Sequence, residues 1–461
     1  MSPVKTALAL LVVLVLAGCG SEGSEESSGT PDPNATLSVA NLIGVSTWDP
    51  ARSLGGPEIQ LLSLVYDRLV YTDPSGNLKP GAAKSWHFDD GGSTLAMQLR
   101  DGLKFSDGTP ITGEVVKQNI ERALSLPESS IAPSMAKIAN VQAEGNTIRI
   151  HQKEPDATLP ALLSDRPGMI VNPATFEALA ADDIPVGSGQ LTVTKQQPGV
   201  SISFAKNGGH WNADTIKVAN VELSVIADPN ARLNAVRTGE VDIARIDADQ
   251  AEDARAASEL TLTTGPALET GSFFFNPSLQ PAFAKPEVRQ AISLAVDRNA
   301  IAQALLFGQA AATAQFYPEG HRAHVPELDQ EVGADPDKAR KLLADAGYPD
   351  GFTFEAIVYS PKMDRVAQAV QEQLKAVGIT MNLKPIPSTN AITEWVQGKA
   401  AGAIFSSSPR TEPNLQFRTA FLPGQPLNPG NIDDSEVTRL IAASAAETDP
   451  EKRLAIDKQI S

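Results

Sequence analysis

Apolar residues fill the chain almost without interruption from Ala7 to Gly18, and the chain then turns polar at once. As a helix this run would reach only ~18 Å, short of the ~30 Å hydrocarbon core of a membrane. A basic Lys5 before the run and small residues at its end are typical of a secretory signal. We therefore expect residues 1–18 to be a signal peptide. Residues 19–36 are rich in Gly, Ser, Pro and acid, and they predict a disordered tether.

Beyond the tether, the hydrophobic pattern switches repeatedly between the period of a strand and the period of a helix. Residues 352–360 alternate apolar and polar side chains, residues 364–378 follow helical spacing, and residues 379–386 alternate again. A strand, a helix of this length and a strand joined by short loops imply a parallel pair with a right-handed crossover. The body is therefore predicted to be α/β, with ligand sites at the carboxyl ends of such strands.

Helix ends are marked by capping and breaking residues. Asp228 precedes a proline where a helix should begin, and Gly239 stands where that helix should end. Residues 285–308 keep apolar side chains at helical spacing, which predicts one long helix. Within residues 263–281, Gly and Pro flank the short apolar strand of residues 273–275, and this pattern predicts a hinge between two large lobes.

The only cysteine of the chain, Cys19, follows the apolar run in the sequence LAGC. This stretch resembles the bacterial lipoprotein box. The resemblance implies that signal peptidase cuts before Cys19 and that its sulfur carries diacylglycerol. Acyl chains gain roughly 0.8 kcal/mol for each buried methylene, so two or more chains give stable anchoring. Without a second cysteine, disulfides are excluded and stability must come from the packed core.

Length and charge narrow the classes of protein further. Even without residues 1–18, a chain of 461 residues is too long for one core and suits two or three domains. The 38 basic and 55 acidic residues give a net charge of -17, which argues against nucleic acid as a partner.

Residues that could support catalysis are scarce. The sequence has no nucleophile-elbow, zinc-protease or nucleotide-binding glycine motif, and its sole cysteine belongs to the lipid site. His321 and His324 are three residues apart, but a following proline favours a solvated pair over a metal site. We expect neither a cofactor nor a metal. A binding protein is favoured, and a secreted lipoprotein hydrolase is a remote alternative.

Several separated stretches together resemble one family, the extracytoplasmic solute-binding proteins of peptide and nickel type ABC importers, called family 5. Residues 78–116 are similar to the family's signature region, and the matching residues are Trp86, Leu99, Arg100, Gly102, Lys104, Phe105, Asp107 and Gly108. Later stretches are similar too, among them GSGQL, FFFNPS and PEVRQAISLAVDR. The resemblance runs from about residue 37 to the last residue.

The resemblance implies two lobes that close by hinge bending around a buried solute. It places lobe I at residues 37–74 and 186–268, an extra domain of that lobe at residues 75–185, and lobe II at residues 269–461. Family members return a final segment to lobe I, and we expect this return to be missing here. The implied setting is a lipid-anchored monomer at the outer face of the bacterial cell membrane, in the periplasm or at the cell surface, with ABC permease subunits as partner.

Two loops and the hinge are candidate ligand contacts. Residues 51–58 contain Ser53 and Gly55, and glycines there let backbone N–H groups approach a ligand. Phe274 and Asn276 could line the cleft at the hinge. In peptide-binding relatives, a carboxylate in a second-lobe loop pairs with the α-amino group of the ligand.

The comparable position of that carboxylate here is near Pro409, beside Arg410. Two interpretations stay open for Arg410 and Glu412: exposed loop charges, or a site where Arg410 selects a carboxylate or another anion. The favoured ligand is a peptide or peptide-like solute, and the alternative is a metal chelate, opine, sugar or other anion. The candidate ligand-binding residues are Ser53, Leu54, Gly55, Phe274, Asn276, Phe405, Ser407, Arg410 and Glu412.

Overall fold

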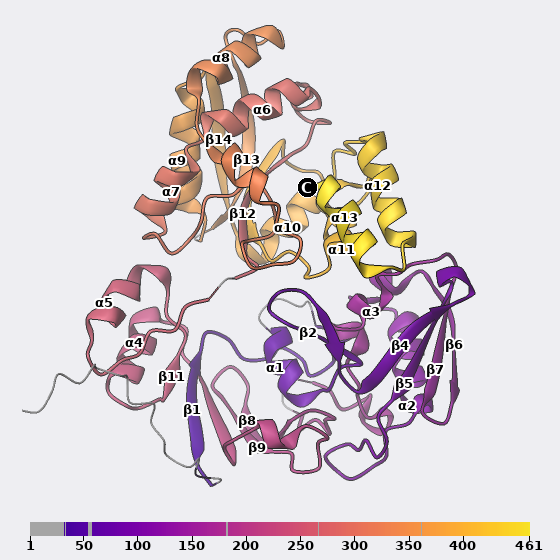
Figure 1. Cartoon of the computed structure of the whole chain (residues 1–461). Coiled ribbons are helices and arrows are strands. Elements are labelled where there is room, and N and C mark those ends of the chain that lie inside the picture. The colour runs from indigo at the N-terminus through magenta and orange to yellow at the C-terminus, as the bar shows by residue number, and fades with distance from the viewer. Residues whose placement is uncertain (1–31, 33, 54–57, 181–182, 266, 361) are drawn as a thin grey trace, which may run out of the picture.

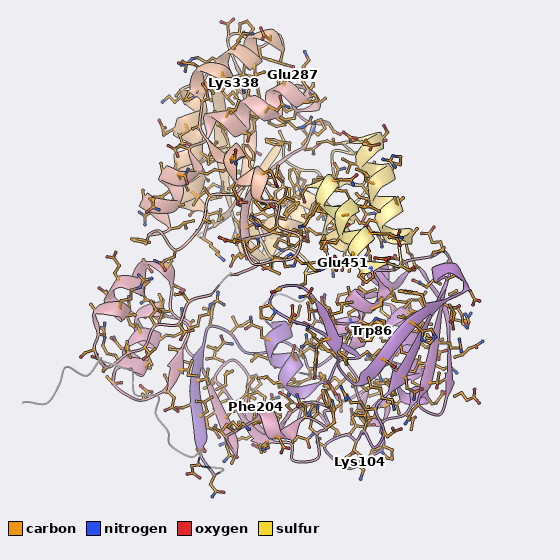
Figure 2. The ribbon with its side chains drawn as sticks, viewed as in Figure 1. Trp86, Lys104, Phe204, Glu287, Lys338 and Glu451 are labelled. Atoms are coloured by element: carbon orange, nitrogen blue, oxygen red, sulfur yellow. The ribbon has the colours of Figure 1, made fainter. Side chains whose placement is uncertain are left out.

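Two lobes and an extra domain form the described part of the chain in the computed structural model (Figure 1). The described residues are 32, 34–53, 58–180, 183–265, 267–360 and 362–461, without the side chains of 331, 332, 388, 389 and 407. The predicted two-lobed α/β architecture is confirmed. Figure 2 labels Phe204 in lobe I, Trp86 in the extra domain and Glu287 in lobe II. Within the described residues, no helix is long and apolar enough to cross a membrane.

Lobe I is built on a five-stranded sheet in the order β11-β1-β10-β9-β8. The strands are β1 (Thr36–Asn41), β8 (Leu191–Gln197), β9 (Ser201–Lys206), β10 (Asn220–Val225) and β11 (Ile243–Ala244), and the helices are α1 (Glu58–Val65), α4 (Pro229–Arg237) and α5 (Ala251–Ala256). Strand β1 is parallel to both β10 and β11. The Asp228 side chain accepts a hydrogen bond from the Ala231 N–H at 2.7 Å, so it caps α4 as predicted.

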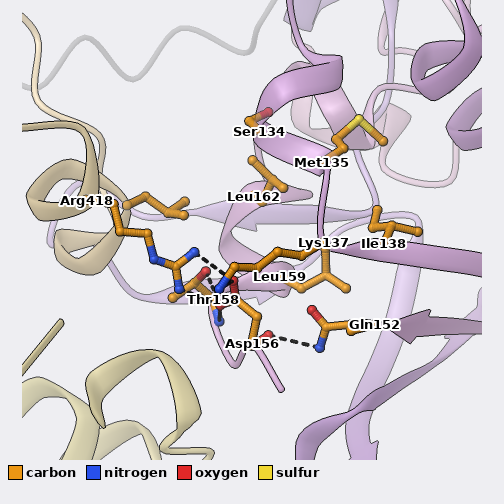
Figure 3. A pocket seen from close by; sticks show the side chains of 11 residues that line it. Ser134, Met135, Lys137, Ile138, Gln152, Asp156, Thr158, Leu159, Leu162 and Arg418 are labelled. Atoms are coloured by element: carbon orange, nitrogen blue, oxygen red, sulfur yellow. Dashed lines mark hydrogen bonds and ion pairs between the residues drawn. The ribbon is translucent and has the colours of Figure 1, made fainter. Parts of the chain in front are cut away.

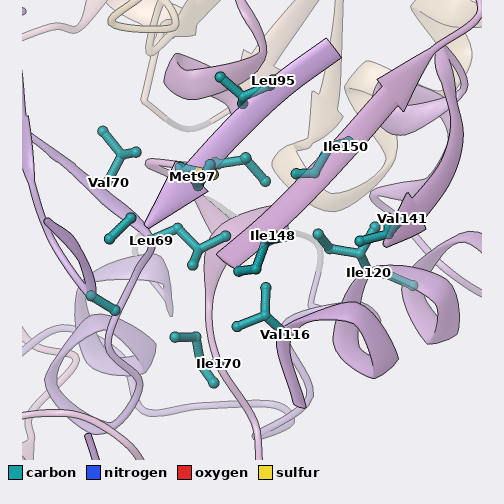
Figure 4. Close-up of a cluster of buried hydrophobic side chains, with 14 of the residues drawn as sticks. Leu69, Val70, Leu95, Met97, Val116, Ile120, Val141, Ile148, Ile150 and Ile170 are labelled. Carbon is teal, nitrogen blue, oxygen red and sulfur yellow. The ribbon is translucent and has the colours of Figure 1, made fainter. Parts of the chain in front are cut away.

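The extra domain is an antiparallel sheet in the order β4-β5-β7-β6, covered by one long helix. Its elements are β4 (Ala83–Asp89), β5 (Thr94–Leu99), α2 (Gly113–Ser125), β6 (Ile138–Glu144), β7 (Thr147–Gln152) and the short α3 (Leu159–Leu162). Val116 and Ile120 of α2 pack on Met97, Ile148 and Ile150 of the sheet, all buried (Figure 4). A two-stranded ribbon of β2 (Val70–Thr72) and β3 (Leu78–Pro80) leads into it from lobe I.

Lobe II has a four-stranded sheet in the order β12-β15-β13-β14. The elements are β12 (Thr270–Phe275), α6 (Pro286–Ala295), α7 (Arg298–Leu305), α8 (Pro336–Asp345), β13 (Phe352–Ser360), α9 (Asp364–Lys375), β14 (Ile379–Pro387), α10 (Ser388–Val396) and β15 (Gly402–Ser407). Strands β13 and β14 are parallel with α9 between them in sequence, so that predicted unit is confirmed. Strand β12 is antiparallel to β15.

Two predictions for lobe II were wrong. The expected long helix over residues 285–308 is two helices, because the chain leaves helical geometry at Val296. The Asp297 side chain then caps α7 by accepting a hydrogen bond from the Ala300 N–H at 2.9 Å. Both helices keep their apolar side chains in one core, so spacing alone could not show the break. Residues 273–275 are not a free hinge strand either, because β12 is hydrogen-bonded into the lobe II sheet. The described residues that link the lobes, 257–265 and 267–269, form no helix or strand.

The last three helices form a separate unit, which we call the C-terminal unit. It consists of α11 (Pro413–Phe421), α12 (Ser435–Ala446) and α13 (Pro450–Ile460). A core of its own joins these helices to the loop around residue 320, and its buried members are Tyr317, Ala323, Phe417, Leu440, Ile441 and Ile460. The unit lies between the lobe II sheet and the extra domain (Figure 1). It contacts that domain through Arg418 and Asp156, and through the Ala157 N–H, which donates to the Ala445 carbonyl at 2.7 Å.

Candidate functional site

Charged side chains of the extra domain and lobe II meet at what we call the interlobe charge group: Asp165, Arg166 and Arg410. Asp165 precedes a short 3₁₀ turn, Arg166–Gly168, and its Oδ1 accepts the Arg166 backbone N–H at 2.7 Å. Arg410 Nη1 lies 3.8 Å from Asp165 Oδ2, and the two side chains are 39% and 31% exposed. The backbone of Arg410 is held by lobe II, since its carbonyl accepts the Tyr317 hydroxyl at 2.8 Å. The group therefore joins two parts of the fold by partly exposed charges.

The Arg166 guanidinium is anchored by hydrogen bonds to neighbouring residues. Its Nη1 donates to Ser130 Oγ at 2.9 Å and to the Ser53 carbonyl. Its Nε is buried and has no hydrogen-bond partner among the described residues. Burial lowers the pKa of Arg166; the Asp165 carboxylate opposes this shift and the positive charge of Arg410 adds to it.

Ser53 is the one described candidate of the first-lobe loop, since Leu54 and Gly55 lie outside the described residues, as does Cys19. Ser53 is buried, and its hydroxyl donates to Glu58 Oε2 at 2.8 Å. The same glutamate accepts the Ser46 N–H at 2.7 Å through Oε1. The Ser53 carbonyl thus lies next to the Arg166 guanidinium. Asp165, the residue before Arg166, faces Arg410.

The candidates on β12 and β15 build the sheet of lobe II. Phe274 and Phe405 stack with ring centroids 4.5 Å apart, and Phe405 is fully buried in a cluster with Trp395. Asn276 is also buried, and its Oδ1 accepts the Ser278 N–H at 3.1 Å in a turn. Ser407 pairs with the start of β12, and its side chain is not among those described. Phe405 and Asn276 could reach a solute only if lobe II rearranged.

Glu412 belongs to a buried cluster of charges inside the C-terminal unit. Its Oε2 lies 2.6 Å from Arg322 Nη2, and its Oε1 lies 3.5 Å from Arg453 Nε. Burial raises the pKa of nearby Asp457 to about 7, with Glu412 adding to the shift, while a 2.5 Å hydrogen bond from Ser444 Oγ opposes it. The prediction for Glu412 is corrected in one respect: the carboxylate is neither an exposed loop charge nor open to solute, because protein arginines hold it.

The loop that contains Arg322 contacts the turn between β2 and β3. In this loop the predicted solvated histidine pair was wrong. His321 is buried and stacks on Tyr317 with centroids 4.4 Å apart, and burial lowers its pKa to about 4. Arg322 donates from its backbone to the Ser75 carbonyl at 3.0 Å and from Nε to the Gly76 carbonyl at 2.9 Å. His324 pairs instead with a nearby aspartate. In the described part of the chain, no three His, Cys, Asp or Glu side chains are grouped to hold a metal.

A third set of charges lies where the sequence led us to expect ligand contacts, at the carboxyl ends of β13 and β15. Lys362 follows β13 and forms an ion pair with Glu269, the residue before β12. Burial alone would raise the pKa of Glu269, but the hydrogen bonds from Lys362 and Ser406 hold it below its ordinary value. The positive charge of Arg245 in lobe I lowers the pKa of Glu269 further, so this ion pair also interacts with a charge of the other lobe.

The cavity of Figure 3 is too small to be the solute site. Its volume is about 10 Å³, room for one water at most. Asp156 and Arg418 meet there, between the extra domain and α11.

Sequence reasoning missed Asp165, Arg166, Glu269 and Lys362. The first two stand in the loop SDRPG, where adjacent opposite charges before a proline are ordinary surface composition. Only the packing of distant segments shows that they face another lobe. Lys362 carried a weak signal, because it follows a predicted strand at its carboxyl end.

Comparisons with known proteins agree with this architecture. The family model described as "Bacterial extracellular solute-binding proteins, family 5 Middle" matches residues 77–428. The chain is 27% identical to the glutathione-binding protein GsiB of Escherichia coli (strain K12) over 343 residues. That alignment covers 72% of this chain and 66% of the relative, slightly less than two thirds of its length.

Solved structures share the fold over nearly the whole chain. DppA from Helicobacter pylori, in complex with the peptide STSA, has a TM-score of 0.79 at 20% identity and covers 93% of this chain and 90% of that one. NikA from Staphylococcus aureus, in complex with Ni(L-His)2, has a TM-score of 0.73 at 20% identity, with coverages of 92% and 90%. At such identities the structures establish the fold alone. The family model matches well over half of this chain, so the chain belongs to the bacterial extracellular solute-binding proteins of family 5.

Proposed function

We propose that this chain is the substrate-binding component of an ABC importer, which captures a small solute between its lobes and delivers it to a membrane permease. The observation that carries the proposal is the meeting of Arg410 with Asp165 across the lobes of a family 5 fold. A solute that contacts both sides favours the closed arrangement over the open one, and this difference couples binding to closure.

The solute is a peptide or peptide-like molecule with a free carboxylate, and Arg410 binds that group. A guanidinium offers two parallel donors to a carboxylate, and Arg410 is exposed enough to reach one. Glutathione, the peptide STSA and nickel-bound L-histidine, which the relatives' names give, are all built from amino acids. A metal chelate is therefore the second candidate ligand.

The protein works at the extracytoplasmic face of the membrane, held there by lipid on Cys19. Support comes from the LAGC sequence behind the apolar run. Mass spectrometry of the N-terminal peptide of the mature protein should find diacylglycerol on the sulfur of Cys19. A free, unlipidated Cys19 on the mature protein would contradict lipidation at this residue.

Mass spectrometry of solute released from denatured, freshly purified protein tests the proposed ligand class. Calorimetry with the solute so identified should then show at least tenfold weaker binding for Arg410→Ala. Arg149→Ala is the matched control, since this arginine is 48% exposed and paired within the extra domain. Unchanged affinity of the Arg410 variant would contradict its role, and turnover of the solute would indicate a hydrolase instead.

A further inference from the structure

Asp165 presents one fixed carboxylate oxygen to an arginine of the other lobe. Its Oδ1 is committed to the Arg166 backbone N–H at 2.7 Å, which caps the turn that follows. This bond leaves Oδ2 as the oxygen nearer Arg410, at 3.8 Å from Nη1. Because the turn holds the carboxylate in place, it stands beside Arg410 without needing a solute.

A second arginine–aspartate pair between the extra domain and the C-terminal unit shows what a permanent contact looks like in this chain. Arg418 donates to both oxygens of Asp156 at 2.6 and 2.9 Å, and these side chains are 16% and 6% exposed. The Arg410–Asp165 distance of 3.8 Å exceeds the usual hydrogen-bond length. The donors of Arg410 are therefore not saturated by Asp165, and solvent reaches both groups.

The arginines of the interlobe charge group keep hydrogen-bond donors that no described residue uses. Arg166 and Arg410 stand against the single carboxylate of Asp165, and the hydrogen bonds that described residues make to the Arg166 guanidinium all run through Nη1. Glu58 contributes a further negative charge, but its two oxygens are bonded to Ser46 and Ser53 of lobe I. A solute carboxylate at this place could therefore accept hydrogen bonds from Arg410.

We propose that Asp165 is a specificity-determining residue, an internal carboxylate that occupies Arg410 until the carboxylate of a solute displaces it. The inference rests on the proposed function, in which Arg410 binds that carboxylate. A partly exposed pair of this kind is weak, which lets a solute displace it. An acidic solute then competes with Asp165 for Arg410. A solute without a carboxylate does not pair with Arg410, so its affinity does not change when Asp165 is replaced.

The test compares Asp165→Asn with the unaltered protein, using the whole mature chain and calorimetry with three probes: glutathione, the tripeptide Ala-Ala-Ala and its C-terminal amide. Asparagine keeps an oxygen for the turn and removes the charge. We expect affinity for the two acids to rise about two- to fivefold, the range for a partly exposed pair, and affinity for the amide to stay unchanged. The gain should shrink in high salt. Asp165→Ser, which also caps turns, guards against a folding defect of the first variant.

Asp101→Asn is the matched control, because it removes the same charge from the extra domain where the partners are Lys84 and Asn146 of that domain. Weaker binding of the acids by both Asp165 variants, or an equal gain for the amide, would overturn the inference. If Arg410→Ala weakens the acids while the Asp165 variants change nothing, the inference fails and the role of Arg410 stands. If Arg410→Ala changes nothing, or no probe binds any of the proteins, the proposed function fails as well.

Discussion

The buried pair of Arg418 and Asp156 makes a measurable contribution to the joining of the C-terminal unit and the extra domain. Arg418→Met leaves the Asp156 carboxylate, whose side chain is 6% exposed, without its bidentate partner. Removal of one partner of a buried pair costs about 3–5 kcal/mol. Lys137 Nζ stays 3.4 Å from Asp156 Oδ2 and compensates in part, so we expect a loss of about 3 kcal/mol in the free energy of unfolding.

This loss depends on pH in a direction that the structure sets. Burial alone would raise the pKa of Asp156, but Arg418 and Thr158 hold it below its ordinary value. A carboxyl with a lowered folded pKa stabilises the protein above its unfolded pKa of about 3.9, and this contribution is lost as the pH falls through the folded pKa. The variant should therefore lose most at pH 7 and progressively less as the pH falls below about 4.

Urea unfolding of four proteins provides the assay: the unaltered chain, Arg418→Met, Asp156→Asn and the double variant. The double variant should lose about 2 kcal/mol less than the sum of the single losses, because it leaves no unpaired charge. Arg149→Met is the control, since its pair with Asp89 is 48% and 33% exposed and contributes about 0–1 kcal/mol. Additive losses within about 0.5 kcal/mol, or a loss that is undiminished at pH 3, would refute the reasoning.

Two other perturbations act inside the C-terminal unit and on the loop packed against it. Asp457→Asn should raise thermal stability more at pH 8 than at pH 5. Burial raises the pKa of this carboxyl to about 7, so stability is lost as the pH rises from the unfolded pKa of about 3.9 through the folded pKa; an equal shift at both pH values in a melting experiment would contradict this. Gly76→Ala should destabilise the protein more than Gly108→Ala. The two glycines have nearly the same φ, +88° and +87°, but a Cβ added at Gly76 would lie 2.4 Å from His321 Nε2, whereas one at Gly108 would meet no atom within 4 Å. The positive φ alone costs about 1–2 kcal/mol at either position, and equal losses in urea unfolding would exclude a role for His321.

Local chemistry explains which parts of the fold were predictable. A cap such as Asp228 acts on the chain three residues away, so its sequence neighbours are enough to place a helix start. The parallel pair of β13 and β14 was predictable because short loops leave few ways to connect a strand, a helix and a strand. The break at Val296 was not, because α6 and α7 bury their apolar sides in one core and so keep the spacing of a single helix.

The candidate site could be predicted only in part, since its charges come from distant segments. Arg410 was identified through the family resemblance, beside the position of the relatives' carboxylate, and the structure adds that it faces Asp165. Nothing in the local sequence of Asp165 distinguishes it from a surface residue, because its partner is set by the packing of one lobe on another. The same reason applies to Glu412, which looked like a loop charge and is buried against two arginines.

The separate core of the C-terminal unit has a consequence for the order in which the protein folds. Tyr317 and Ala323 stand far before Phe417 and Ile460 in the sequence, yet all four share one apolar cluster. Contacts between such distant segments form late, because loop closure must come first. Lobe I and the extra domain do not need these contacts and can fold first, whereas the C-terminal unit is complete only once α13 packs on α11 and α12. Until then the apolar side chains around Tyr317 stay open to water, and this interval is when a chaperone or a protease would meet them.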